Sequence, residues 1–242
     1  MEILIINPNT TASMTEKIGA AARAAGSSGT SITAVNPATG PESIEGFYDE
    51  ALAVPGLLVE ISKGETRGVA GHVIGCFDDT GLDAARALAR APVVGIGEAA
   101  FHVASLIAGS FSVVTTLGRA VPAIQQNLVR YGLASRCARV RAAEIPVLSL
   151  EDPGSDARHR IEAEIDLARR EDRAEAIVLG CAGMADLAAD LSKHCGLPVV
   201  DGVAAAVVLV EALAALGLRT SKVGGYALPL PKAIRGFPPM AR

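Results

Sequence analysis

The strongest constraint on the fold of this chain is an internal repeat. Segments Val73–Cys76 and Val178–Cys181 each consist of two aliphatic residues followed by Gly-Cys. The two cysteines are 105 positions apart (181 − 76), and the Pro-Val-Val pieces that follow, beginning at Pro92 and Pro198, are 106 apart (198 − 92). Two units in the same order and at the same spacing predict two similar lobes related by a pseudo-twofold axis.

Short apolar runs alternate along the chain with Ala- and Leu-rich segments of helical length. The expected strands are Ile3–Ile6, Ser31–Val35, Val69–Gly75, Val93–Ile96, Phe111–Thr115, Val140–Glu144, Ala176–Gly180 and Val199–Asp201. The expected helices include Thr11–Ala25, Gly81–Ala91, Glu98–Ala108, Val121–Tyr131, Asp156–Glu171 and Ala185–Cys195. Such alternation is typical of βαβ units and of a mostly parallel sheet.

The predicted architecture is therefore an α/β fold of two similar lobes, each with a mostly parallel sheet flanked by helices. We expect residues 1–97 together with 204–242 to form the first lobe and residues 98–203 to form the second. Hydrophobic residues make up 50% of the 242-residue chain, so apolar side chains suffice for a sizeable core. The active site is expected in the cleft between the lobes.

Charge and hydropathy exclude two kinds of partner. The net charge is −4 and the 22 Lys and Arg residues are scattered, so we expect no nucleic-acid partner. The longest apolar run, Gly202–Val210, is stopped by Glu211. It is shorter than the roughly 18 residues that a membrane crossing needs, so we expect no membrane partner either.

The cysteines and the N-terminus predict a cytoplasmic protein. Met1–Ile6 lacks the basic region of a secretory signal, and the four cysteines have no Cys-X-X-Cys spacing. Free thiols of this kind are typical of a reducing compartment. No Cys or His pair has the spacing of metal ligands, so no metal site is expected. Cys137 and Cys195 lie outside the repeat features and are expected to be inert.

Polar and thiol-bearing residues follow four of the expected strands. In sheets of this kind, ligands bind beyond the carboxyl ends of the strands. The repeat therefore places Asn7–Thr10, Cys76, Thr115–Gly118 and Cys181 around one cleft, with equivalent segments on opposite walls. A pair of thiols at repeat-equivalent positions is expected to be functional.

Two opposed thiols suit the inversion of a carbon centre by two bases. Each cysteine lies just before an expected helix, whose N-terminus favours the thiolate and brings a thiol pKa of about 8.5 toward neutrality. One thiolate then removes a proton from one face of a carbon while the other thiol supplies a proton to the opposite face, without metal or cofactor. Backbone N–H groups of residues 75–77 and 180–182 are expected to stabilise the enolate that forms. Hydroxyls of Thr115 and Thr116 and amides of Asn7 and Asn9 are expected to hold polar substrate atoms.

The half-units that end in Gly-Cys resemble the aspartate/glutamate racemase superfamily. Within it, Asn7–Thr10, Gly75–Asp78 and Leu179–Met184 resemble the hydantoin racemase branch. The likeness extends over nearly the whole chain, from residue 3 to about residue 225. It adds a family expectation to the fold and the thiol pair inferred from the residues themselves.

The resemblance implies a cofactor-independent isomerase that interconverts D- and L-5-monosubstituted hydantoins by proton exchange at ring carbon 5. Cys76 and Cys181 are the implied catalytic residues, and the partner is a small-molecule substrate. The expected substrate contacts are Asn7, Asn9, Ile44, Phe77, Asp78, Asp79, Thr115, Thr116, Gly118, Gly180, Ala182, Gly183 and Met184. An apolar side made of Ile44, Phe77, Phe101 and Met184 is expected to admit the 5-substituent.

Related activities are weighed by the residues that differ. Glutamate racemases carry Asp-Ser-Gly and Thr-His where this chain has Asn7-Pro8-Asn9 and Ala182-Gly183, which disfavours a charged amino-acid substrate. Arylmalonate decarboxylases keep only the second cysteine, so Cys76 argues against that activity. Allantoin racemases share both cysteines and stay as an alternative. A small-molecule binding module with non-catalytic thiols is the alternative outside enzymes.

The two thiols are expected to differ in acidity. Asp78, Asp79 and Thr80 are expected to cap the helix after Cys76, and the two carboxylates raise the pKa of that thiol. Ala182-Gly183 has no such effect on Cys181. We therefore predict that Cys181 more often carries the thiolate in the free enzyme.

Other segments carry separate expectations. Residues 36–47 form either a lid over the cleft or an exposed connection. Gly95–Gly97 is too short for a dinucleotide fingerprint. The apolar segment Val203–Ala215 predicts a homo-oligomer, and the tail Pro229–Pro239 is expected to run extended along the surface or onto a neighbouring subunit.

Overall fold

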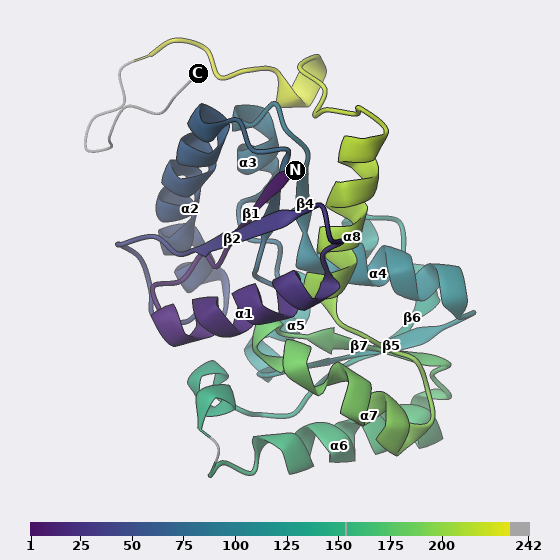
Figure 1. Cartoon of the computed structure of the whole chain (residues 1–242). Coiled ribbons are helices and arrows are strands. Elements are labelled where there is room, and N and C mark those ends of the chain that lie inside the picture. Colours follow the sequence, from purple (N-terminus) through teal and green to yellow (C-terminus); the bar gives the residue numbers. More distant parts are fainter. Residues whose placement is uncertain (153, 233–242) are drawn as a thin grey trace.

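The strands form two parallel sheets with the same internal order (Figure 1). A computed structural model describes residues 1–152 and 154–232. The first sheet has the order β2-β1-β3-β4, with β1 (Glu2–Ile6), β2 (Ser31–Val35), β3 (Gly71–Ile74) and β4 (Val93–Gly95). The second has the order β6-β5-β7-β8, with β5 (Phe111–Thr115), β6 (Cys137–Ala142), β7 (Ala176–Gly180) and β8 (Val199–Val200). Because each sheet pairs its first strand with its second and third, the predicted duplication and the α/β fold class are confirmed.

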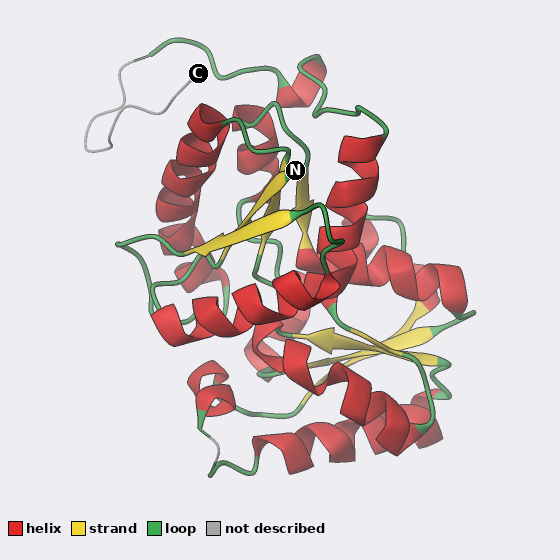
Figure 2. Ribbon diagram, viewed as in Figure 1, coloured by secondary structure: helices red, strands yellow, loops and turns green. Residues whose placement is uncertain are grey.

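Helices cover the faces of both sheets (Figure 2). The α-helices are α1 (Ala12–Ala25), α2 (Phe47–Arg67), α3 (Leu82–Leu88), α4 (Ile96–Ile107), α5 (Val121–Arg130), α6 (Ala157–Leu167), α7 (Ala188–Cys195) and α8 (Gly202–Ala215). Short 3-10 segments are η1 (Gly118–Ala120), η2 (Ala134–Arg136), η3 (Val147–Glu151), η5 (Ala182–Leu187) and η6 (Gly224–Tyr226), and η4 (Ala168–Asp172) is a π turn.

Alternating residues of each strand face different cores. Leu4 and Ile6 of β1 pack toward α2 and α3, whereas Ile3 and Ile5 belong to a central core with α1, α4 and α8. Val113 of β5 joins this same central core, while the far face of the second sheet packs on α6 and α7. The central core is therefore shared by both sheets and holds them against each other.

The element boundaries differ from expectation in a few places. The sixth strand begins at Cys137 and ends at Ala142, earlier than the expected 140–144, and Glu144 beyond it has φ +55°. Helix α3 ends at Leu88, and α4 begins at Ile96 because the strand before it stops at Gly95. The long helix α2 was not among the segments named from the sequence.

Helix α8 corrects the argument for an oligomer. Its residues Val203, Ala206, Val207 and Val210 are buried, and it contacts α1, α4, β3 and β4. The apolar character of this segment is thus explained mainly by packing within the chain, so it does not carry the prediction of a homo-oligomer. Its contacts with α1, β3 and β4 support our proposal that residues 204–215 belong to the first lobe, and its contacts with α4 pack it against the second.

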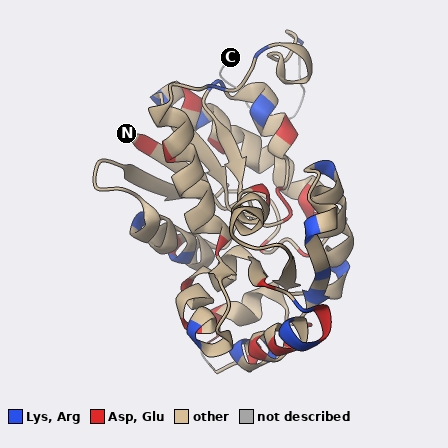
Figure 3. Cartoon of the chain, turned by 90° about the vertical axis from the view of Figure 1, so that its right-hand side faces the viewer, with Lys and Arg blue, Asp and Glu red and all other residues tan. Residues whose placement is uncertain are grey.

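Two other expectations concern the chain ends and surface. Residues 229–232 of the expected extended tail are exposed, and the rest of that tail lies outside the described residues. Positive and negative residues are intermixed over the ribbon (Figure 3). Within the described ranges, no helix combines the length and apolar character that a membrane span requires.

Candidate active site

The carboxyl ends of the strands in both sheets meet at one cleft. Both predicted catalytic cysteines line it, one directly after β3 and Gly75, the other directly after β7. The lining consists of Asn7, Asn9, Met14, Ile44, Gly75, Cys76, Phe77, Asp78, Thr115, Thr116, Ala120, Val147, Gly180, Cys181 and Ala182. The topology therefore brings together thiols that are 105 residues apart in sequence (181 − 76).

The Cys76 thiol lies in a loop that we call the Cys76 loop, residues 76–81. The Thr80 hydroxyl donates a hydrogen bond to the Cys76 sulfur over 3.3 Å, and the backbone N–H of Asp78 also faces this sulfur. Burial raises the pKa of the Cys76 thiol well above its ordinary value, and the Asp78 and Glu50 carboxylates raise it further. Hydrogen bonds from Thr80 and Asp78 oppose this rise without cancelling it.

The Cys181 thiol has a similar backbone environment and a different charge environment. Burial raises its pKa to about 11, and the backbone N–H of Gly183 opposes this rise. The Lys17 ammonium favours the thiolate, whereas Asp78 and Glu151 disfavour it. Cys181 is followed by η5, a short 3-10 segment.

The expectation of thiol pKa values near neutrality is wrong for the unliganded cleft. No regular helix starts at either cysteine, since α3 begins only at Leu82 and the segment after Cys181 is η5. The loss of hydration on burial then outweighs the nearby N–H groups. Burial raises the pKa of both thiols, and the Asp78 carboxylate beside Cys76 raises its pKa further, as expected. The predicted order of the two thiols stays a prediction.

The carboxylate next to the Cys76 thiol is itself strongly perturbed. Burial raises the pKa of Asp78 to about 8, and the negative charges of Glu50 and Asp79 add to this effect. Glu50, from the first turn of α2, has a raised pKa through burial and the neighbouring Asp49. Its Oε1 atom is buried and has no hydrogen-bond partner within the described part of the chain. Glu50 was missed because nothing in its local sequence marks it as close to Cys76.

Asp79 has a role that differs from the expected one. Its carboxylate accepts hydrogen bonds from the backbone N–H groups of Gly97 and Glu98, at 2.9 and 2.7 Å, and thus caps α4 rather than the helix after Cys76. The Tyr131 hydroxyl donates to the same carboxylate over 2.8 Å. Burial raises the pKa of Asp79 to about 7, against these hydrogen bonds. Asp79 does not line the cleft.

The two asparagines of the first strand end line the cleft, while several of their polar atoms bond within their own loop. The Asn7 amide donates to Asn9 Oδ1 over 2.8 Å and to the Thr15 hydroxyl over 3.0 Å. The Asn9 amide lies 3.2 Å from the Met14 sulfur. These contacts fix the shape of the cleft wall, and substrate contacts by both residues stay a proposal.

The second lobe supplies the equivalent wall through Thr115 and Thr116. The Thr115 hydroxyl donates to the Gly180 carbonyl over 2.9 Å, which joins the ends of β5 and β7 next to Cys181. A Cβ at Gly180 would lie 2.7 Å from Thr115 Cβ, so the glycine permits this close approach. Both threonines line the cleft as expected.

Some expected contacts lie behind the lining. Gly118, Gly183, Met184 and Phe101 do not line the cleft; Met184 and Phe101 are fully buried in the cores. Phe101 instead supports the cleft residue Phe77 through an edge-to-face contact at 5.3 Å. The apolar lining residues that were not predicted are Met14, Ala120 and Val147. They lie outside the repeated motifs, so no sequence signal singled them out.

The loop 36–47 reaches both lobes at the cleft. Ile44 lines the cleft, and the neighbouring Glu45 accepts a hydrogen bond from the Val147 N–H of the second lobe over 2.9 Å. On the other side, the Thr10 N–H donates to the Pro41 carbonyl over 2.9 Å. The loop thus covers the cleft edge, which supports the lid interpretation as a proposal.

This architecture and thiol pair place the chain in a known family. The family model described as Asp/Glu/Hydantoin racemase matches residues 3–210, and the chain belongs to this family. The resemblance inferred from the Gly-Cys repeat is confirmed.

Full-length relatives agree with this assignment. The chain is 50% identical to a hydantoin racemase of Rhizobium meliloti, covering 98% of both chains. It is 45% identical to a hydantoin racemase of Pseudomonas sp. (strain NS671), covering 98% of this chain and 95% of the relative. Among solved structures, an allantoin racemase from Klebsiella pneumoniae is 51% identical with a TM-score of 0.96, covering 98% of this chain and 96% of that one.

Proposed function

We propose that the protein is a cofactor-independent isomerase that racemises 5-monosubstituted hydantoins through Cys76 and Cys181. The observation that carries the proposal is the placement of both thiols in one cleft, at equivalent strand ends of two duplicated lobes. The family membership and the hydantoin racemases at 50% and 45% identity support the same reaction and the predicted enzyme class.

The reaction needs one thiolate and one thiol at a time. The thiolate takes the proton from ring carbon 5, and the electron pair of that C–H bond passes into the adjacent carbonyl as an enolate. The opposite thiol then gives its proton to the other face of carbon 5 and becomes the thiolate. The carbon is inverted, atoms and charge balance, and the enzyme is left ready for the reverse direction.

The cleft lining suits an uncharged ring with a variable substituent. Met14, Ile44, Phe77 and Val147 supply apolar surface. Peptide groups at the two Gly-Cys segments supply backbone donors, as proposed for the enolate. Arg and Lys are not found among the lining residues, in keeping with a substrate that carries no carboxylate.

Allantoin is the second candidate substrate. Asp78 lines the cleft and Glu50 lies close enough to raise its pKa, so hydrogen-bond acceptors stand beside the Cys76 wall. The ureido group of allantoin is rich in N–H donors that such acceptors would bind. The allantoin racemase at 51% identity supports this candidate.

The testing experiment follows the C5 proton of single enantiomers of 5-benzylhydantoin and allantoin by NMR in heavy water, with optical rotation recorded on the same samples. We expect wild-type protein to exchange the proton and lose rotation, and Cys76→Ala and Cys181→Ala to lose racemisation. Exchange no faster than in enzyme-free controls on both rings would overturn the proposal and favour a binding module. Exchange of allantoin alone would assign the second substrate.

The predicted cytoplasmic location and homo-oligomeric state stay predictions. Free cysteines Cys76, Cys137, Cys181 and Cys195 are consistent with a reducing compartment. Light scattering of the purified protein measures the oligomeric state directly.

A further inference from the structure

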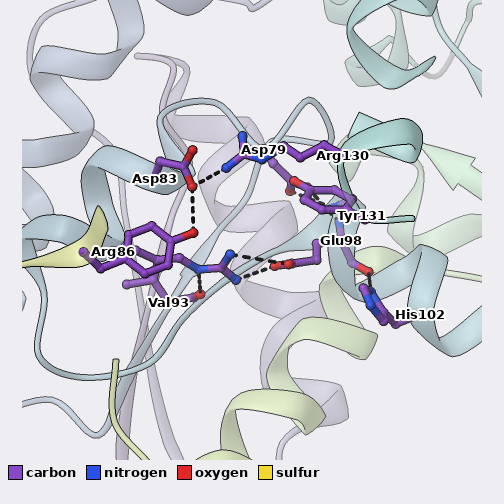
Figure 4. Close-up of polar contacts among 10 residues, drawn as sticks. Asp79, Asp83, Arg86, Val93, Glu98, His102, Arg130 and Tyr131 are labelled. Atoms are coloured by element: carbon purple, nitrogen blue, oxygen red, sulfur yellow. Dashed lines mark hydrogen bonds and ion pairs between the residues drawn. The ribbon is translucent and has the colours of Figure 1, made fainter. Parts of the chain in front are cut away.

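The Cys76 loop is held by a helix of the opposite lobe. Helix α5 follows β5 of the second sheet, and Tyr131, directly after its end, lies beside Asp79 of the loop that carries the first-lobe thiol (Figure 4). The Asn127 amide donates to the Asp78 carbonyl over 2.8 Å, and the Tyr131 hydroxyl donates to Asp79 over 2.8 Å. Residues 127 and 131 are one helical turn apart, so both donors point the same way.

Asp79 connects this helix to the loop and to α4. It is 5% exposed, and its φ of +51° lies in the left-handed region that non-glycine residues seldom occupy. Its N–H donates to the Cys76 carbonyl over 3.0 Å, and its carboxylate caps α4. Each hydrogen bond of the Asp79 carboxylate comes from another part of the chain. The surrounding structure therefore holds this residue in its unfavourable backbone conformation.

Gly95 and Gly97 make room for Asp79. A Cβ on Gly95 would lie 2.0 Å from Asp79 Oδ1. A Cβ on Gly97 would lie 2.9 Å from Asp79 Oδ2 and 2.3 Å from the Phe77 carbonyl oxygen. The Gly95–Gly97 segment is thus shaped around this carboxylate, which ties β4 and α4 to the Cys76 loop.

We propose that Tyr131 and Asn127 are positioning residues, which hold the Cys76 loop from the second lobe and thereby place the Cys76 sulfur at the cleft. Neither residue lines the cleft, so neither is a catalytic residue. Their effect passes through the loop backbone, including the Asp78 N–H that faces the Cys76 sulfur. The placement of the Cys76 loop by these two residues does not depend on the reaction, whereas the expected effect on turnover rests on the proposed racemase function.

The test compares Tyr131→Phe with Tyr226→Phe. The first removes the hydroxyl that bonds Asp79, and the second removes a hydroxyl that donates to Asp83 at the start of α3, outside the Cys76 loop. Alkylation by iodoacetamide is followed at each cysteine by peptide mass spectrometry, which makes Cys181 an internal control within each protein. This measurement needs no substrate.

In Tyr131→Phe we expect Cys76 alkylation to accelerate about fivefold or more, because loops with fewer anchoring hydrogen bonds open more often. Alkylation of Cys181 should change less than about twofold, as should both thiols in Tyr226→Phe. Asn127→Ala, which removes the second donor, should repeat the Tyr131→Phe pattern. Equal changes in the alkylation rates of both thiols would overturn the proposal. So would an unchanged alkylation rate of Cys76 in both Tyr131→Phe and Asn127→Ala, provided that their melting temperatures are also unchanged.

Turnover gives a second readout that separates this proposal from the proposed function. With an active substrate, Tyr131→Phe should lower kcat about tenfold with KM changed less than about twofold, since displacement of a reacting group costs rate more than binding. Selective Cys76 alkylation without any wild-type turnover would retain the positioning role and reject the racemase. Wild-type turnover with unselective alkylation would retain the racemase and reject the positioning role.

Discussion

The two thiol walls of the cleft share a backbone plan and differ in their charges. Each has a strand, a glycine, a cysteine and an N–H two residues later that faces the sulfur, from Asp78 on one wall and Gly183 on the other. The equivalent position therefore carries a carboxylate beside Cys76 and no side chain beside Cys181. Duplication explains the common geometry, whereas divergence of single residues makes the two thiols unequal.

The walls are also held differently across the lobes. Asn127 of α5 and Tyr131 directly after it reach the Cys76 loop through two partly buried hydrogen bonds, whereas α1 of the first lobe reaches η5 through the ion pair Lys17–Asp186 at 3.2 Å. An ion pair that is partly exposed contributes little to stability. The Cys76 wall is therefore anchored from the opposite lobe by hydrogen bonds, whereas the Cys181 wall has the Lys17 ammonium nearby. Burial raises the pKa of both thiols.

Removal of either thiol is the change that should distinguish the roles of the two walls most strongly. We expect Cys76→Ala and Cys181→Ala each to lose racemisation by about 10²–10⁴-fold, since each removes one proton-transfer group. Each variant should still exchange the C5 proton of one enantiomer, and the two variants should select opposite enantiomers. NMR in heavy water with each enantiomer measures this selection. If both variants exchange the same enantiomer, the walls do not face opposite sides of the substrate.

Alkaline activity is the second expected signature. Because burial raises the pKa of Cys181 to about 11 and also raises that of Cys76 well above its ordinary value, we expect little thiolate in the free protein at neutral pH. We expect kcat/KM to rise about tenfold per pH unit between pH 7 and 9, as the thiolate fraction does. Initial rates across this range, on protein shown by circular dichroism to stay folded, check the slope. A flat profile would place the thiolate pKa far lower.

Asp78→Asn tests the charge that distinguishes the two walls. Removal of the carboxylate should lower the pKa of both thiols, and that of Cys76 by more. At Cys76 the Asp78 charge is exceeded only by burial, whereas at Cys181 it also ranks below the Gly183 hydrogen bond. Ultraviolet thiolate absorbance in single-cysteine backgrounds measures both values. Equal shifts at the two thiols would contradict the asymmetry.

The same variant should change the pH dependence of stability. Burial raises the pKa of Asp78 from 3.8 to about 8, so its contribution to stability is complete below about pH 4 and is lost as the pH rises to about 8. Asp78→Asn does not titrate and keeps its stability as the pH rises. The gap in the free energy of unfolding between variant and wild type should therefore be about 1–3 kcal/mol in favour of the variant at pH 8, and absent at pH 4. Urea unfolding at both pH values measures the gap. The exposed carboxylate Asp190 offers the control, since Asp190→Asn should show none.

Lys17→Met should give the smallest effect. The ammonium is the nearby positive charge that favours the Cys181 thiolate, so its removal should raise the pKa of Cys181 and leave that of Cys76 unchanged. Lys17 is partly exposed, and solvent therefore screens its charge. Thiolate absorbance in the Cys76→Ala background measures the shift. An unchanged or lowered pKa of Cys181 would show that the Lys17 charge does not stabilise its thiolate.

Much of the site could be predicted from the sequence because the repeat acts through backbone geometry. Cys76, Cys181 and Asn7 follow buried strands, and Thr115 is the last residue of one. Parallel strands bring their carboxyl ends to one edge of each sheet. Hydrophobic periodicity likewise identified most strands to within a few residues. These features depend on local pattern, which is visible in the sequence.

Only the tertiary structure decided the electrostatics and the support of the site. The pKa of Cys76 depends on Glu50 from α2, and the position of its loop depends on Asp79, Asn127 and Tyr131. Val147 and Met14 reach the cleft from segments without a recognisable motif. Burial and Coulomb interactions depend on distances between residues far apart in the chain, so they are set only when the two lobes pack together.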